Sequence, residues 1–225
     1  MTVLTVVLLV AFIALGRWQW QRGTARQATW DQYQRDSSAV EVPEADLDRV
    51  ERFTRVVLTG RFEPKRQFML DNRSHDGQPG YEVLTPLLLA SGRRVLVDRG
   101  WVPFTGYRDR LPDISLADDS VRSVTGRIEE LPAAGLASGR APPSRDASWP
   151  KLTSFPTHEE LAAALDEKIS QRLLLLDPAM PDGYVRAWSP PGLPPVRHFS
   201  YAIQWWGFAV VLLVLYFGLN FRKVP

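Results

Sequence analysis

The sequence contains no cysteine, and this absence excludes several kinds of chemistry. Without thiols the chain cannot attach haem through thioether bonds, bind metals through thiolates, carry out dithiol redox reactions or form disulfide bonds. The three methionines, Met1, Met69 and Met180, are far apart, which argues against a copper site of soft ligands. The net charge is +2 and no basic stripe alternates with aromatic residues, so nothing indicates a nucleic acid partner.

Motifs for phosphate binding and nucleophilic catalysis are also missing. The chain has no G-x-x-x-x-G-K-[ST], no G-x-G-x-x-G and no G-x-S-x-G. His158-Glu159 begins an H-E-x-x-H zinc motif, but Ala162 occupies the second ligand position. We therefore expect no enzymatic activity. An anchored hydrolase is an alternative without a visible nucleophile, carboxylate pair or metal site.

The two ends of the chain are long apolar segments. Residues 1–16 are apolar except for Thr2 and Thr5, and residues 199–221 carry no charge. At about 1.5 Å per residue the second segment reaches about 34 Å, enough for a hydrocarbon core of about 30 Å. The first reaches only about 24 Å and must extend beyond Arg17. We predict transmembrane helices over residues 1–22, including an interfacial end, and residues 198–221.

A cleaved signal peptide is the alternative for the first segment, because Ala14-Leu15-Gly16 offers small residues near a possible cut. The segment lacks a basic start, however, and aromatic and arginine residues follow it as they follow retained membrane helices. The second segment is similarly bounded by aromatic residues at both ends. The residues that form these interfacial belts are Arg17, Trp18, Trp20, Arg22, Tyr201, Trp205, Trp206, Tyr216, Phe217 and Phe221.

Two membrane helices place both termini on one side and residues 23–197 on the other. Arg222 and Lys223, in the tail 222–225, favour a cytoplasmic C-terminus, whereas Arg17, Arg22 and Arg26 would pull the large loop inward. The charge rule weakens for loops longer than about 60 residues, so the tail carries more weight. We expect a multi-pass protein of the bacterial cell (inner) membrane, with an extracytoplasmic domain and cytoplasmic termini.

The intervening domain has the pattern of a β-rich fold. Strand signals lie at residues 53–60, 67–71, 81–89, 95–102, 121–129 and 173–176, with a Gly- and Pro-rich loop or wide hairpin at 72–80. A helical stalk is predicted from Gln27, becoming irregular at Pro43, and a flexible insertion at 132–150. Thr157 and Glu160 predict a capping box before a short helix. The predicted class is membrane α+β: two transmembrane helices flanking a mainly antiparallel sheet domain with a small helical component.

Only three histidines are present, and one lies in a distinctive position. His75 and His158 are expected at the surface. His198 opens the second apolar segment, and Tyr201 and Trp205 follow three and seven residues later, on the same helical stripe. An imidazole there can ligate iron while its other nitrogen is held by a neighbour. The alternative is an interfacial histidine that bonds to lipid headgroups or caps the helix.

Three blocks of sequence resemble a known family. They are Leu15-Gly-Arg-Trp-Gln-Trp-Gln-Arg22; Gly80-Tyr-Glu-Val-Leu-Thr-Pro86 with Val95-Leu-Val-Asp-Arg-Gly-Trp-Val-Pro103; and His198-Phe-Ser-Tyr-Ala-Ile-Gln-Trp205. Their order, spacing and membrane context resemble the Surfeit locus protein 1 family of cytochrome oxidase assembly factors. Departures include Asp98, where many members have Asn, and the insertion at 132–150.

The resemblance implies a helper that binds or hands over haem a during assembly of the oxidase catalytic subunit. It implies that His198 is the haem ligand and that Gly100-Trp101 is functionally sensitive. We expect Trp205, Tyr201 and Trp18 as walls, with Arg17 or Arg22 pairing with the propionates.

The expected partners are cytochrome c oxidase subunits, chiefly the haem-bearing one, and membrane lipid. Tyr81, Arg99, Gly100 and Trp101 are the candidate partner contacts. Packing is the other interpretation of the last three, since Trp101 could fill the core and Gly100 could permit a bulge. The alternative function is a scaffold or resident accessory subunit without haem, docking through Tyr81, Trp101 and the hairpin loop.

Overall fold

The computed structural model describes the chain except for residues 1, 36–37, 109, 117, 134–138 and 221–225. It divides into two compact units, residues 1–36 with 189–225, and residues 37–188. The first contains the two apolar helices and the second contains the sheet.

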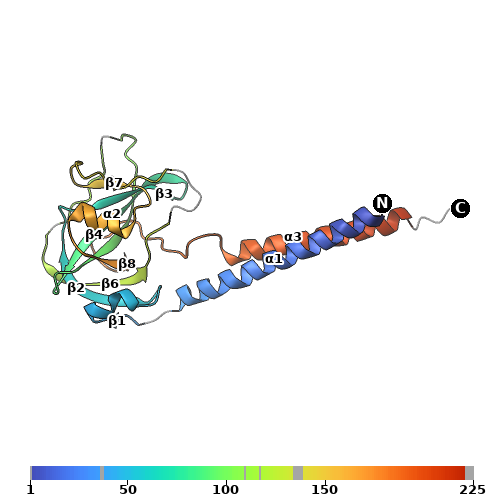
Figure 1. The fold of residues 1–225 in the computed structure, drawn as a ribbon, viewed down its shortest axis with the longest axis horizontal. Coiled ribbons are helices and arrows are strands. Elements are labelled where there is room, and N and C mark those ends of the chain that lie inside the picture. The colour runs from blue at the N-terminus through green and yellow to red at the C-terminus, as the bar shows by residue number, and fades with distance from the viewer. Residues whose placement is uncertain (1, 36–37, 109, 117, 134–138, 221–225) are drawn as a thin grey trace. The chain divides into compact units, whose positions relative to one another are not determined.

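The helical unit is an antiparallel pair of long helices, α1 (Thr2–Gln34) and α3 (Pro195–Asn220). They run side by side with both chain ends at the same end of the pair (Figure 1). Both helices are long and apolar enough to cross a membrane, as the sequence predicted. Where the membrane begins and ends along them stays a prediction.

Small residues set the packing of this pair. Gly16 and Gly23 are buried seven residues apart on α1, and a Cβ at either would overlap an aromatic ring of α3, Trp206 or Phe199. Ala202 and Ala209 are buried at the same spacing on α3. A spacing of seven keeps small residues on one side of a helix and lets the two backbones approach closely.

The second unit is built on one eight-stranded sheet, with strand order β1-β2-β6-β8-β5-β4-β3-β7. An additional pairing of β2 with β4 closes five strands, β2, β6, β8, β5 and β4, into a ring. The strands are β1 Val40–Glu41, β2 Arg55–Phe62, β3 Phe68–His75, β4 Gln78–Leu89, β5 Arg94–Pro103, β6 Val121–Glu129, β7 Lys151–Thr153 and β8 Ile169–Leu176.

The prediction of a mainly antiparallel sheet is wrong, because the sheet is mixed. Strands β3, β4 and β5 form the expected meander, but β1 pairs with β2, β7 with β3 and β8 with β5 in parallel. A hairpin can be predicted from the short turn that joins its two strands. The parallel partners in this sheet are joined by long connections, which contain no such local signal.

The hairpin between β3 and β4 is tighter than predicted. His75 pairs with Gln78, so only Asp76 and Gly77 remain in the turn, and both have positive φ, +49° and +77°. These angles fit a type I′ turn, the two-residue turn that Asp-Gly favours. Most of the predicted loop at 72–80 is therefore strand.

Two short helical elements accompany the sheet. The predicted helical stalk is confirmed only as far as Gln34, where α1 ends, and the 3₁₀ helix η1 (Glu44–Arg49) lies in the stretch predicted to be irregular. Helix α2 (His158–Leu165) has the predicted capping box of Thr157 and Glu160. It packs Leu161 and Leu165 against strand residues such as Phe68 and Leu96. Part of the predicted insertion, 134–138, lies outside the described residues.

Candidate functional site

His198 makes a polar contact across the helix pair. Its Nδ1 lies 2.9 Å from Oε1 of Gln19 on α1. Gln19 lies three residues after Gly16 and four before Gly23, so helical periodicity directs it toward α3. Both side chains are half-buried. This is the polar partner that a ligating histidine needs at the nitrogen that does not bind metal.

Aromatic rings continue from His198 along one side of the pair. Trp205, two turns from His198, stacks on Phe12 of α1 with ring centroids 5.7 Å apart, and Phe208 lies 5.9 Å from the same ring. Tyr201 lies between His198 and Trp205 along α3 and is 45% exposed. We call this surface the His198 face; it consists of Phe12, Gln19, His198, Tyr201, Trp205 and Phe208.

The predicted cations and Trp18 are distributed around α1. Arg22 follows Gln19 by three residues, so it lies on the side of α1 that borders the His198 face. It is one helical turn closer than Gln19 to the end of the pair at which α3 begins. Its guanidinium lies 5.5 Å from the Trp18 ring centroid. Arg17 and Trp18 are exposed, Trp18 at 49%, and helical periodicity turns both away from α3. The structure thus places His198, Tyr201 and Trp205 on one stripe of α3, whereas Arg22 contacts Trp18.

The residues predicted to contact a partner are inside the sheet domain. Tyr81 is 1% exposed among Met69, Val83 and Val102, and its hydroxyl has no hydrogen-bond partner among the described residues. Burial raises the pKa of that hydroxyl. A partner could reach Tyr81 only after local rearrangement.

Arg99 is a buried guanidinium, 2% exposed. Burial is the main cause that lowers its pKa from the ordinary value, although the side chain stays a cation. It donates to oxygen atoms from separate segments, none of them a carboxylate: Asp182 O at 2.6 Å, Gln67 Oε1 at 2.9 Å, Ile114 O at 3.2 Å, and Thr85 Oγ1 and Tyr184 OH at 3.4 Å. These bonds join β5 to Gln67 just before β3, to β4 and to two loops, so Arg99 has a structural role.

Gly100 and Trp101 occupy a crowded stretch of β5. Gly100 has φ +110°, and a Cβ there would lie 2.6 Å from the carbonyl oxygen of Val185. The Trp101 ring packs over Gly80 and lies 5.4 Å from the His75 ring. These contacts favour the packing interpretation of both residues.

Two carboxyl groups lie beside this stretch, that of Asp98 buried and that of Glu82 half-buried. Asp98 is 2% exposed and accepts a hydrogen bond from the Gly100 N–H at 3.0 Å. Burial, and then the charge of Glu82, raise the pKa of Asp98 well above its ordinary value. Burial also raises the pKa of Glu82, although Arg73 lies 2.9 Å from it and opposes the shift.

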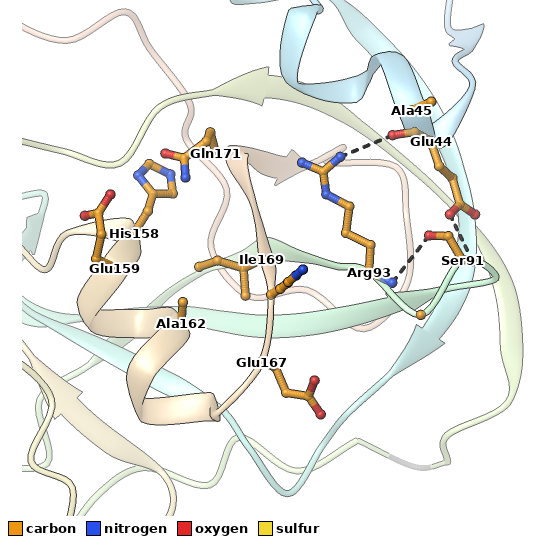
Figure 2. A pocket seen from close by; sticks show the side chains of 12 residues that line it. Glu44, Ala45, Ser91, Arg93, His158, Glu159, Ala162, Glu167, Ile169 and Gln171 are labelled. Atoms are coloured by element: carbon orange, nitrogen blue, oxygen red, sulfur yellow. Dashed lines mark hydrogen bonds between the residues drawn. The ribbon is translucent and has the colours of Figure 1, made fainter.

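A cavity of about 690 Å³ opens on the other side of the domain, between α2, η1 and the β4–β5 turn. Figure 2 shows His158 and Glu159 on one side of it, and Arg93, Ser91 and Glu44 on the other. The Glu44 carboxylate already accepts the backbone N–H of Ser91 at 3.1 Å. None of the residues predicted to bind cofactor or partner lines this cavity.

His158, expected at the surface, is half-buried at this cavity. Its Nε2 has no hydrogen-bond partner within the described part of the chain, and burial lowers its pKa. A neutral imidazole at the wall does not by itself define a ligand.

Gln19 and Phe12 are site residues that the sequence did not predict. The stripe of His198, Tyr201 and Trp205 could be found because it lies within one helix. Gln19 is 179 residues from His198, and only the matching spacing of Gly16 with Gly23 and Ala202 with Ala209 could have indicated which side of α1 faces α3.

Known proteins with similar sequences indicate the family to which the chain belongs. The sequence model described as the SURF1 family matches residues 6–210, which include most of both helices and all eight strands. The chain belongs to the SURF1 family. Members of the SURF1 family are known generally as cytochrome oxidase assembly factors, not as enzymes.

Individual SURF1-like proteins match over different lengths. One from Mycobacterium tuberculosis is 28% identical over 210 residues, which cover 90% of this chain and 75% of its own. A Mycobacterium bovis protein matches to the same extent, and both are described as uncharacterised. A SURF1-like protein of Dictyostelium discoideum is 41% identical over 66 residues, 28% of this chain and 24% of its own.

Proposed function

We propose that this protein assists the assembly of a haem-copper cytochrome c oxidase by binding haem a on the His198 face and passing it to the catalytic subunit. In this proposal the protein lies in a bacterial cell membrane, with the sheet domain extracytoplasmic and both termini cytoplasmic. Membership of the SURF1 family supports the general role in oxidase assembly.

The observation that carries the haem proposal is the position of His198. It lies at the end of an aromatic surface, held by Gln19, with Arg22 one turn further along α1. Haem a is a large apolar macrocycle with a lipid-like tail and two carboxylates, so it needs an axial base, apolar walls and a cation near water. The residues present fit those requirements.

Each residue then has one task. His198 would supply a nitrogen ligand to the iron, while Trp205 and Phe12 would form a stacked apolar wall that Tyr201 extends. Arg22 pairs with a propionate at the membrane surface, and its planar fork suits a bidentate contact with a carboxylate. The whole face is half-buried or exposed, so a haem bound there stays accessible to a partner subunit in the bilayer.

The test is the absorption spectrum of the full-length protein, purified in detergent from cells that make haem a. We expect a haem a spectrum in the wild type that is lost or shifted in His198→Ala. His75→Ala and His158→Ala are matched controls, because they remove the other two imidazoles from the sheet domain, and we expect them to leave the spectrum unchanged.

Equal spectra in wild type and His198→Ala would overturn the assignment of the iron ligand. A colourless wild-type protein that still captures oxidase subunits would overturn haem binding and favour a scaffold or resident accessory subunit.

A further inference from the structure

The contact between Gln19 and His198 is a polar contact in a helix interface that is mainly aromatic and aliphatic; a second polar contact, between Thr2 Oγ1 and Tyr216 OH at 3.1 Å, lies near the other end of the pair. On one side of the contact between Gln19 and His198 the Trp206 ring occupies the space that a side chain at Gly16 would need, which we call the notch at Gly16. On the other side the Phe199 ring occupies the equivalent notch at Gly23. A polar group in such an environment is costly unless it is hydrogen-bonded, so this pair fixes the imidazole against α1.

The chemistry of the two groups determines where the proton lies. A neutral imidazole carries one N–H and one lone pair on its two nitrogens. The amide oxygen of Gln19 only accepts, so the 2.9 Å contact with Nδ1 requires the N–H at Nδ1. The lone pair is then on Nε2, and this nitrogen is free to bind a metal.

We infer that Gln19 is the positioning residue of the haem site: it holds the His198 proton on Nδ1 and thereby presents Nε2 to the iron. This inference rests on the proposed function. If the Gln19 amide were turned, its NH₂ group would donate to Nδ1 and the proton would move to Nε2. That tautomer has no lone pair for iron, so the two arrangements make opposite predictions.

The first test uses haem-free, full-length protein in detergent, labelled with ¹⁵N-histidine. The His198 signals are identified as those missing from His198→Ala. We expect the proton on Nδ1 in the wild type. In Gln19→Leu, which keeps a similar shape but removes the acceptor, we expect a mixture of both tautomers. A proton on Nε2 in the wild type would overturn the inference.

The second test is titration of the same proteins with purified haem a. Outer partners of metal-ligating histidines typically contribute about 10- to 100-fold in affinity, and we expect a loss of this size in Gln19→Leu. Gln19→Glu retains an acceptor oxygen, so we expect it to keep tight binding. Gln21→Leu is the matched control. Gln21 lies two residues after Gln19, is exposed, and by helical periodicity points away from α3.

Failure of the inference differs from failure of the proposed function. If haem binding depends on His198 but Gln19→Leu binds as tightly as Gln21→Leu, then Gln19 does not position the ligand. If the wild type binds no haem, or His198→Ala binds it equally well, the haem proposal fails. The ¹⁵N spectra of the haem-free protein still decide which nitrogen Gln19 holds.

Discussion

Asp98 places an ionisable group where the folded protein disfavours its charge. Its raised pKa means that the folded state binds a proton more tightly than the unfolded chain does. The stabilisation from the protonated carboxyl is complete below the ordinary pKa of about 3.9 and is lost as the pH rises through the higher folded value.

We therefore predict that Asp98→Asn raises the free energy of unfolding at neutral pH by on the order of 1 kcal/mol, because an amide keeps an acceptor for the Gly100 N–H without a charge. The gain should shrink as the pH falls to about 4. Urea unfolding of the full chain at several pH values, followed by near-ultraviolet circular dichroism, measures it. A gain independent of pH would contradict the explanation.

Gly100 is sensitive for a steric reason. We predict that Gly100→Ala destabilises the sheet domain by about 1–3 kcal/mol, because the new Cβ meets the Val185 carbonyl at a positive φ. Gly92→Ala is the matched control, since Gly92 also has a positive φ but open space around it. Thermal unfolding of both variants separates the clash from backbone strain, and equal losses would exclude the clash.

At the scale of elements, the notch at Gly16 aligns the two helices. We predict that Gly16→Leu separates α1 from α3, because the larger side chain and the Trp206 indole cannot occupy the same space. Gly207→Leu is the control, since nothing lies within 4 Å of the Cβ position at Gly207.

The separation can be measured between spin labels at Thr24→Cys and Ser200→Cys, because the chain has no other cysteine. We expect a longer and broader distance distribution in Gly16→Leu and an unchanged one in Gly207→Leu. The same distribution in both would show that the notch does not set the packing.

Elements with a local cause could be predicted from the sequence. The capping box at Thr157 and Glu160, strand β6 and the two apolar helices are confirmed, because each depends on neighbouring residues. The parallel pairings could not be predicted, since β5 and β8 are brought together by a connection of more than 60 residues. The contact of Gln19 could not be predicted for the same reason, because its partner His198 lies far away in the sequence, in the other terminal helix.

At the scale of the whole molecule, the antiparallel helices require both termini to lie on one side of a membrane that both helices cross. We predict that a cysteine at Asp146, an exposed residue of the sheet domain, reacts with a membrane-impermeant maleimide in intact cells. Lys223→Cys should react only after the cells are permeabilised. The reverse pattern would place the domain in the cytoplasm.

The two helices of the pair are made at different times. Residues 35–194 separate α1 from α3, and at about 5–20 residues per second their synthesis takes roughly 10 to 30 s. During that interval α1 exists without α3, so Trp206 and Phe199 do not yet cover Gly16 and Gly23 and the Gln19 amide lacks its imidazole partner. The His198 face is therefore completed only after α3 has been made, so we expect a product truncated before α3 to lack the proposed haem site.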